Sequence, residues 1–483
     1  MNKHLFISSL SAGLLLTPNL KAEKRPNIVL IIADDVSYDD IGCYGNTVVN
    51  TPNIDRLALE GMRFDNAFLA TSSSSPSRCC IITGKYPHST GAAELHTPLP
   101  ESEIPFPLLL KESGYYTAQA GKWHMGPSVH RAFDRYTDEN GYDNGDGGED
   151  NWVRFLKERP KDKPFFLWLA SHDAHRPWGA DEFEINHDPK TINVPLYLAD
   201  TPETRRDLAS YYNEIARFDS YIGKVREELE QQHVFENTLI IVMADNGRPF
   251  PRCKTRVYDS GMKTPFIVSW PNSIKNKGSV SESLISAVDI APTLLELADV
   301  QIPSFIQGKS FVEILWDPDK EIRTEIFSEH NWHDYEAYER MVRTKEFLYV
   351  FNGRPNLTNC GPADSKTSPS QHSLNILRDK GRLTAAQADV FVAPRPFEEL
   401  YHVTDDSLQL INLASIPRYQ HELEKCRKTL MQWQEETGDT LPENLTKDWF
   451  DRETGDPLNV KKERGIMPGV RQFRANATSR TNK

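Results

Sequence analysis

Four short apolar runs, separated by amphipathic helical patterns, constrain the fold of this chain more than any other feature. The runs cover residues 28–32, 165–170, 239–244 and 266–270. Unbroken apolar runs of about four to eight residues are typical of parallel strands that are buried on both faces. Helical patterns at 54–62 and 211–231 lie between the runs. Strands that alternate with helices predict an α/β fold, in which helices flank a mostly parallel sheet.

The sequence pattern changes after about residue 335. Short apolar segments at 341–344, 347–351 and 399–401 predict further strands, and residues 418–436 predict a helix. We therefore expect a main domain over residues 23–335 and a smaller α+β domain over 336–452. Residues 453–483 are polar and rich in Lys and Arg, which predicts an extended tail.

The first 22 residues have the layout of a secretory signal peptide. Lys3 precedes an apolar run at 5–16, and the small residue Ala22 stands at the expected cleavage point. No other apolar stretch reaches the roughly 18–20 residues that span a bilayer. We therefore expect a protein without a membrane span, which is periplasmic or secreted after the signal is removed.

Charge and cysteine content argue against several classes of protein. The 69 acidic and 56 basic residues give a net charge of −13, which argues against general binding to nucleic acid or to anionic membranes. Any anion that the chain binds must therefore meet locally clustered cations. The six cysteines are too scattered for a disulfide framework, and we expect buried thiols or one isolated disulfide.

Oxygen-bearing side chains follow two of the predicted strands. Asp34 and Asp35 come at the end of the first run, and Asp245 and Asn246 come directly after the third. Each pair by itself is also typical of an ordinary turn. In open α/β sheets, however, ligands gather at the carboxyl ends of the strands, and oxygen ligands suit Ca²⁺ or Mg²⁺. No Cys/His pattern has the spacing of a zinc site.

A serine-rich segment carries the most specific signal. Residues 74–87 read SSPSRCCIITGKYP, and residues 121–126 read GKWHMG. The first segment resembles the signature of type I sulfatases, in which a Cys or Ser is oxidised to formylglycine when Pro and Arg follow two and four residues later. The second resembles the other signature of that family. Ser74 alone among its serine neighbours has Pro76 and Arg78 at those positions, so it would be the oxidised residue.

The resemblance covers roughly residues 25–440 and implies an alkaline-phosphatase-like fold. In that family a hydroxyl of the hydrated aldehyde attacks the sulfur of a sulfate ester, which forms a sulfated enzyme, and loss of a proton from the other hydroxyl expels sulfate. The resemblance also implies one Ca²⁺ ion as cofactor. Its ligands would be Asp34, Asp35, oxidised Ser74, Asp245 and Asn246.

The same resemblance implies a role for each of several cationic or titratable residues. Arg78 and Lys122 would hold the hydrate, and His124 would be the base of the elimination step. His175 would donate a proton to the departing oxygen, with His172 as its rival for this role. Lys254 would bind the sulfate, with Arg252 and Arg256 as rivals.

The sequence indicates the substrate less specifically than it indicates the reaction. The segments at 245–254 and 172–176 resemble the branch that contains heparan N-sulfatases and bacterial polysaccharide sulfatases. The substrate implied is a sulfated polysaccharide or its oligosaccharides, either algal, such as ulvan or carrageenan, or a glycosaminoglycan. The aromatic and polar segment 328–335 is a candidate sugar pocket, and an interdomain turn is its alternative reading. The substrate-binding candidates are His172, His330, His333 and Asp334.

Two other functions remain open from the sequence. A phosphodiesterase or phosphonate hydrolase on the same scaffold would act on an anion of similar shape, although such enzymes generally use two metal ions. A protein whose Ser74 is never oxidised would bind glycans without turning them over. A serine at position 74 therefore implies a partner, a formylglycine-generating maturation enzyme in the host.

Overall fold

The computed structural model describes residues 25–137, 148–178 and 186–469, and the predicted signal peptide at 1–22 lies outside them. An eight-stranded sheet runs through the larger part of the molecule, with the strand order β5-β4-β6-β1-β7-β8-β2-β9. Its strands are β1 (Asn27–Ala33), β2 (Met62–Phe64), β4 (Tyr116–Gly121), β5 (Arg135–Tyr136), β6 (Phe165–Ala170), β7 (Thr238–Ala244), β8 (Phe266–Ser269) and β9 (Ser279–Ser281). The four predicted runs are therefore all strands of this one sheet.

One of the four strands runs in the opposite direction to the prediction. β1, β6 and β7 are parallel neighbours, but β8 pairs antiparallel with β7 and with β2. The chain between β7 and β8 stays near the edge where β7 ends, so it enters β8 from that edge. A strand buried on both faces is apolar throughout in either direction, which is why the pattern could not reveal the reversal.

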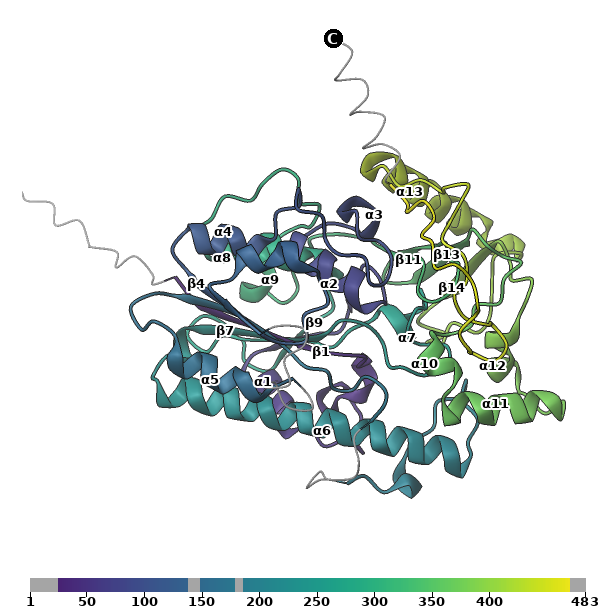
Figure 1. The fold of residues 1–483 in the computed structure, drawn as a ribbon, viewed down its shortest axis with the longest axis horizontal. Helices are drawn as coiled ribbons and strands as arrows, with labels where there is room; N and C mark the ends of the chain where they lie inside the picture. Colours follow the sequence, from purple (N-terminus) through teal and green to yellow (C-terminus); the bar gives the residue numbers. More distant parts are fainter. Residues whose placement is uncertain (1–24, 138–147, 179–185, 470–483) are drawn as a thin grey trace, which may run out of the picture.

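Helices cover both faces of the large sheet, as Figure 1 shows. On one face lie α1 (Pro52–Glu60), α5 (Asp150–Glu158) and α6 (Pro202–Gln231). On the other lie α2 (Ser74–Thr83), α4 (Phe106–Glu112), α8 (Ile290–Leu297) and α9 (Val312–Trp316). Alternate residues of β1 point to the two sides. Ile28, Leu30 and Ile32 join one apolar core, while Val29 and Ile31 join the other.

The sequence pattern located both long helices but misplaced the start of one. α6 begins at Pro202, nine residues before the predicted start at 211. Thr201 caps it by accepting a hydrogen bond from the backbone N–H of Thr204, and Pro202 occupies the first turn. None of the helices in the described part of the chain combines the length and the apolarity that spanning a membrane requires.

A smaller antiparallel sheet lies beside the large one. Its strands, in spatial order, are β11 (Ile326–His330), β12 (Glu339–Arg343), β13 (Phe347–Asn352) and β14 (Glu398–His402). Helix α13 (Gln420–Thr437) packs against it through a core that includes Val342, Leu400 and Trp433. β11 begins before residue 335, so the smaller sheet starts upstream of the predicted domain boundary, and that boundary stays a prediction.

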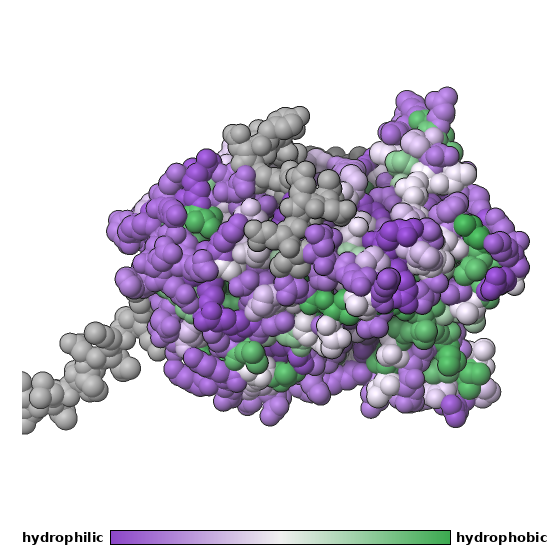
Figure 2. All heavy atoms as spheres, turned by 90° about the horizontal axis from the view of Figure 1, so that it is seen from below, coloured by the Kyte–Doolittle hydropathy of each residue, from purple (hydrophilic) through white to green (hydrophobic). Residues whose placement is uncertain are grey.

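The described chain also contains further strands and α-helices, together with short 3-10 helices. These strands and α-helices are β3 (Ala67–Phe68), β10 (Ile285–Ser286), α3 (Pro87–Thr90), α7 (Asp259–Met262), α10 (Ala363–Lys366), α11 (Pro369–Asp379) and α12 (Ala385–Ala388). All six cysteines are free thiols, and all but Cys43 are buried. The face shown in Figure 2 is mainly hydrophilic, with its apolar side chains in separate small patches.

The described part of the predicted tail does not extend into solvent. Residues 453–469 contain no helix and no strand, but they fold back on the molecule. Arg464 forms an ion pair with the buried carboxylate of Glu94, at 2.8 Å, and the backbone N–H of Gly465 donates to the side chain of Thr446. The last residues of the tail, from 470, lie outside the described residues.

Candidate active site

The candidate site lies at the carboxyl edge of the parallel strands. Asp34 and Asp35 follow β1, and Asp245 and Asn246 follow the neighbouring strand β7. Ala33 and Ala244, the last residues of the two strands, are register partners, so both polar pairs leave the sheet at the same level. The backbone N–H of Asp35 lies 3.3 Å from Oδ1 of Asp245. The sheet register thus explains why residues so distant in the chain converge.

Ser74 is the first residue of α2, a ten-residue helix that is buried throughout. Its Oγ atom lies 3.1 Å from Oδ1 of Asp34 and 2.9 Å from Oδ1 of Asn246. The start of a helix carries partial positive charge from unpaired backbone N–H groups, which favours a negatively charged group there. The side chain at position 74 is therefore held among oxygen ligands in an environment that suits an anion.

Two buried cations lie beside Ser74. Arg78, one turn along α2, donates from Nε to Oδ2 of Asp245 at 2.9 Å. Lys122 forms an ion pair with Asp34, and its Nζ lies 3.4 Å from Oγ of Ser74. Nη1 of Arg78 has no hydrogen-bond partner among the described residues. These cations offset part of the free energy that burying the carboxylates costs, and they leave donors for a bound anion.

A glycine allows Lys122 to enter the site. Gly121 ends β4 with φ +88°, and a Cβ atom there would lie 1.8 Å from the carbonyl oxygen of Ala170 at the end of β6. Only glycine combines this backbone conformation with such a close approach. The next residue, Lys122, donates its backbone N–H to the same carbonyl at 3.0 Å, which anchors the start of the loop.

The three buried carboxylates have very different acidities. Burial would raise the pKa of Asp34, but the positive charge of Lys122 and of other nearby cations outweighs it, and the pKa lies well below its ordinary value. Burial raises the pKa of Asp35 to about 7, against the effect of Lys254, and that of Asp245 to about 6, against the effect of Arg78. A divalent cation among these oxygens would favour the ionised form of all three.

His124, which follows Lys122, contacts a residue that the sequence analysis did not select. Its Nε2 atom lies 2.7 Å from Nδ1 of His96, so the two rings share one proton in this contact. Burial, and then the charge of Lys122, hold the pKa of His124 well below its ordinary value, so the imidazole is neutral. Both histidines have positive φ angles, 57° and 61°, which the surrounding tertiary structure imposes.

Of the two histidines that follow β6, the structure places His175 closer to the carboxylate of Asp35. Its Nε2 lies 3.6 Å from Oδ2 of Asp364 and 4.0 Å from Oδ2 of Asp35, whereas His172 is exposed. Burial and the charge of Lys254 lower the pKa of His175 to about 4. The negative charge of a bound sulfate would raise that pKa, so His175 would acquire a proton to donate when sulfate is near.

Lys254 and its two rivals point in three directions. Nζ of Lys254 lies 2.7 Å from Oδ2 of Asp35, which brings it into the site. Arg252 instead pairs with Asp389 at 3.0 Å. The guanidinium of Arg256 is buried without a hydrogen-bond partner among the described residues. The geometry therefore favours Lys254 for contact with a sulfate.

The predicted sugar-binding residues separate into two groups. Nδ1 of His333 lies 2.6 Å from Oγ of Ser73, the neighbour of the proposed nucleophile. Asp334 accepts a hydrogen bond from the backbone N–H of Ala363 at 2.9 Å. His330 is buried at the end of β11, where its Nδ1 lies 2.8 Å from Glu339 of the same small sheet. Among these contacts, only that of His333 reaches the segment that carries Ser74.

Sequence reasoning missed Asp364 and His96. Both stand in segments without a recognised motif, and only the hydrogen bonds to Lys254 and His124 identify them. Positive φ at His96 leaves no trace in the sequence. Asp364 belongs to α10, a single short turn that no periodicity marks.

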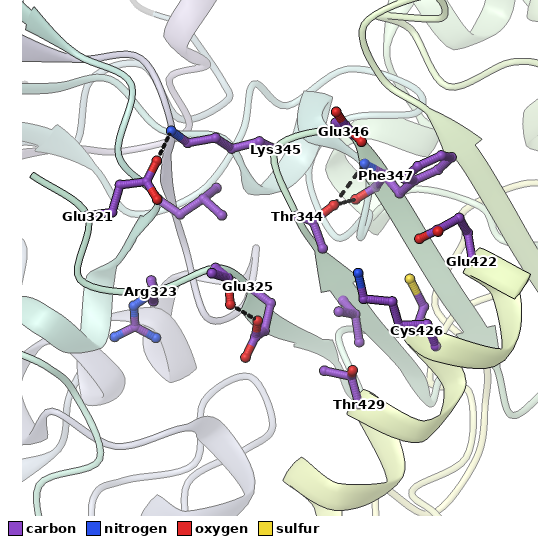
Figure 3. A pocket seen from close by; sticks show the side chains of 14 residues that line it. Glu321, Arg323, Glu325, Thr344, Lys345, Glu346, Phe347, Glu422, Cys426 and Thr429 are labelled. Carbon is purple, nitrogen blue, oxygen red and sulfur yellow. Dashed lines mark hydrogen bonds and ion pairs between the residues drawn. The ribbon is translucent and has the colours of Figure 1, made fainter. Parts of the chain in front are cut away.

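A separate cavity of about 400 Å³ lies between residues 321–325, the β12–β13 hairpin and α13 (Figure 3). Its lining includes none of the candidate site residues. The carboxylates that line it belong to Glu321, Glu325, Glu346 and Glu422. Arg323, Lys345 and Lys425 also line it, so the cavity carries charges of both signs.

Comparison with known proteins agrees with this geometry. Residues 26–300 match the family described as Sulfatase, and residues 253–351 match the C-terminal region of N-sulphoglucosamine sulphohydrolase. The human N-sulphoglucosamine sulphohydrolase is 32% identical over 88% of this chain and 93% of its own length. An ulvan-active sulfatase of Formosa agariphila is 31% identical over 89% of this chain and 79% of its own length.

A solved structure shares the fold. A protein bound to its substrate D-glucosamine-2-N,6-O-disulfate superposes with a TM-score of 0.67, at 21% identity, over 86% of this chain and 98% of the other. The sheet order, the convergence of the strand-end residues and the matches over most of the chain lead to one conclusion. The chain belongs to the sulfatase family and is a sulfuric ester hydrolase.

Proposed function

We propose that this protein removes sulfate groups from a sulfated polysaccharide or its oligosaccharides, with an oxidised Ser74 side chain and a calcium ion at its active site. One observation carries the proposal. Oγ of Ser74 lies between Oδ1 of Asp34 and Oδ1 of Asn246, with Nζ of Lys122 3.4 Å away. An ordinary serine has no need of this arrangement, whereas an activated nucleophile that must bind a metal ion and an anion does.

The donor set fits calcium. Asp34, Asp35, Asp245 and Asn246 offer buried carboxylate and amide oxygens, and the side chain at position 74 offers one more. Hard oxygen ligands of this kind suit Ca²⁺, and nearby His175 is a less suitable ligand for it. Bound there, calcium would supply positive charge beside a sulfate oxygen, and the oxidised side chain would supply the nucleophile.

The surrounding residues would then bind and orient the reacting groups. Lys122 and Arg78 would hold the oxygens at position 74 and offset negative charge as the sulfate approaches. His124 is neutral and half-buried beside Lys122, so it is able to accept a proton from a hydroxyl at position 74. Lys254 would hold a sulfate oxygen, and His175 would donate a proton to the departing sugar oxygen.

The substrate class is inferred from relatives and from the site. Two relatives are named for N-sulphoglucosamine and ulvan, which are both sulfated sugars or glycans. His333 borders the proposed nucleophile through Ser73, so it is placed to contact the sugar that carries the sulfate. With the predicted signal peptide, these observations support export and action on an extracellular or periplasmic glycan, after a maturation enzyme has oxidised Ser74.

Mass spectrometry of the peptide that contains Ser74, prepared from the native host, tests the proposal directly. Conversion of the alcohol to an aldehyde removes two hydrogens, so the peptide should be about two mass units lighter than its sequence predicts. The same preparation should release sulfate from at least one member of a panel of heparin, ulvan and carrageenan oligosaccharides. An unmodified peptide together with glycan binding would instead favour the non-catalytic alternative. Preferential release of phosphate from phosphodiesters would favour the phosphodiesterase.

A further inference from the structure

The C-terminal segment 445–466 packs against residues 94–95, which precede His96. Thr446 donates to the buried carboxylate of Glu94 at 2.8 Å, and Arg464 pairs with the same carboxylate at 2.8 Å. Arg464 also donates to the carbonyl of Leu95. Both ends of the segment are thus fastened to residues 94–95, immediately before His96. The segment has a defined place in the fold, although its sequence shows no regular pattern.

Aromatic rings and cations pack together where this segment meets Trp332. The rings of Trp332 and Trp449 lie 4.4 Å apart, and the guanidinium of Arg464 lies 4.6 Å from the first and 5.1 Å from the second. Nζ of Lys462 lies 5.7 Å from the ring of Trp449. Trp332 is buried, Trp449 is half-buried and Lys462 is exposed. Surface exposure therefore increases outward along this row of contacts.

Direct contacts join the same row to the catalytic residues. The backbone N–H of Leu95 donates to the carbonyl of Trp332 at 3.1 Å, and that of Trp449 donates to the carbonyl of Asp334 at 2.9 Å. His96, next to Leu95, contacts His124 at 2.7 Å. One continuous set of contacts therefore leads from the proposed catalytic base to the exposed side chains of His96 and Lys462.

Lys462 differs from its neighbour Lys461 in its contacts. Lys461 forms an ion pair with Glu463, whereas no carboxylate of the described residues lies within ion-pair distance of Lys462. Burial raises the pKa of Asp334, against the lowering effects of the Ala363 N–H, of Lys254 and of Lys462. The proposed sulfate-binding lysine, Lys254, and Lys462 thus both act on the charge of Asp334.

We infer that Lys462, Trp449 and His96 form a subsite that binds an anionic sugar residue next to the one that loses its sulfate. The exposed part of the half-buried Trp449 indole offers apolar surface to a sugar ring, and an exposed ammonium and an imidazole offer donors to its sulfate or carboxylate. Arg464 and Trp332 hold this surface in place from beneath. The inference rests on the proposed function, because it assigns to that enzyme a substrate longer than one sugar.

Binding measurements test the subsite without requiring turnover. Calorimetry with the Ser74→Ala protein would measure the affinities for heparin and ulvan tetrasaccharides. For each tetrasaccharide it would also measure the affinity for the single sulfated sugar from the end at which the enzyme removes sulfate. We expect Lys462→Ala to weaken tetrasaccharide binding by about three- to fivefold, the range of a partly exposed charge pair, and Lys462→Glu to weaken it further. Lys461→Ala, the matched control, should change neither affinity, and monosaccharide binding should be unaffected in all three variants.

Two modified probes identify the anionic group. If a sulfate occupies the subsite, a tetrasaccharide desulfated at its inner residues will lose its sensitivity to Lys462→Ala. If a carboxylate occupies the subsite, the carboxyl-reduced tetrasaccharide will instead lose its sensitivity to Lys462→Ala. Equal weakening by Lys461→Ala, equal weakening for the monosaccharide, or no effect of Lys462→Ala on either tetrasaccharide would overturn the inference. If the wild-type protein released no sulfate while Lys462→Ala still weakened tetrasaccharide binding selectively, the proposed function would be rejected and the subsite would stand.

Discussion

Lys254 and Asp364 join the two sheets of the molecule at the active site. Nζ of Lys254, in the loop after β7, lies 3.3 Å from Oδ2 of Asp364 on α10, although 110 positions separate them in the chain. The same oxygen lies 3.6 Å from Nε2 of His175. Asp364 thus contacts both the lysine proposed to bind sulfate and the histidine proposed to donate a proton. We therefore expect it to be a positioning residue, contributed by the C-terminal part of the chain.

Replacement of this carboxylate should slow the reaction more than it weakens binding. We expect Asp364→Asn to lower kcat by about tenfold, as is common for residues that orient a catalytic group, with a smaller change in KM. Asp364→Glu should recover part of the loss because it restores the charge. Steady-state kinetics on an active oligosaccharide measure both constants. Asp379→Asn, an exposed control on α11, should behave as wild type, and a loss seen only in KM would contradict the assignment.

Ser74→Ala should abolish sulfate release and leave the fold intact. The alanine cannot be oxidised to an aldehyde, so no nucleophile remains, while the buried helix α2 tolerates the smaller side chain. Ser77→Ala is a matched control, because Ser77 lies on the same helix and its Oγ has no hydrogen-bond partner among the described residues. Sulfate release and thermal unfolding would be compared in both variants. Measurable turnover by Ser74→Ala would refute the proposed mechanism.

Removal of calcium should reduce activity and stability together. A metal ion that binds only the folded protein stabilises it by about 2.7 kcal/mol when its concentration is 100 times its Kd. We therefore expect chelation to lower Tm and sulfate release in parallel, and added Ca²⁺ to restore both. In Asp245→Ala the Tm should no longer respond to Ca²⁺, because a buried ligand is missing. A chelated enzyme with full activity would remove calcium from the proposal.

The buried ion pair of Arg340 and Asp439 predicts how stability depends on acidity. Arg340 donates two hydrogen bonds to Asp439, from Nε at 2.7 Å and from Nη2 at 2.8 Å. Burial alone would raise the pKa of Asp439, but Arg340 lowers it to about 2. Because the folded pKa lies below the unfolded one, near 3.8, this contribution to stability is complete above about pH 4 and is lost as the pH falls towards 2.

Urea unfolding at several pH values checks this prediction. Asp439→Asn should cost about 3–5 kcal/mol near neutral pH, because it leaves Arg340 buried without a charged partner. Its stability should also fall less steeply than that of wild type between pH 4 and pH 2. Asp405→Asn, at an exposed position, should retain the wild-type slope. Identical slopes for Asp439→Asn and wild type would show that this pair does not titrate as described.

Local sequence patterns located the parts of the active site that follow strands. Asp34–Asp35 and Asp245–Asn246 could be paired in advance because each follows an apolar run, and parallel strands bring their carboxyl ends to one edge. The signatures at Ser74 and Lys122 identified the proposed nucleophile and its cation because both motifs are contiguous. The structure has six free thiols, which agrees with the expectation of thiols and not with that of one isolated disulfide.

Other features depended on packing between distant segments. Strand β8 has the same apolar pattern in either direction, and only its pairing with β7 shows that it is antiparallel. His96 and Asp364 carry no motif, and they become part of the site through contacts with His124 and Lys254. The segment around Lys462 reads as a polar tail, yet Arg464 fastens it to Glu94.

The sequence by itself determined the α/β architecture, the oxygen-rich strand ends and the residue proposed for oxidation, because periodicity and contiguous motifs are properties of neighbouring residues. Tertiary structure decided the direction of β8, the partners of Lys254 and His124, and the path of the C-terminal segment. Those depend on which surfaces meet when the two sheets pack, and the free energy of such contacts is shared between residues that lie far apart in the chain.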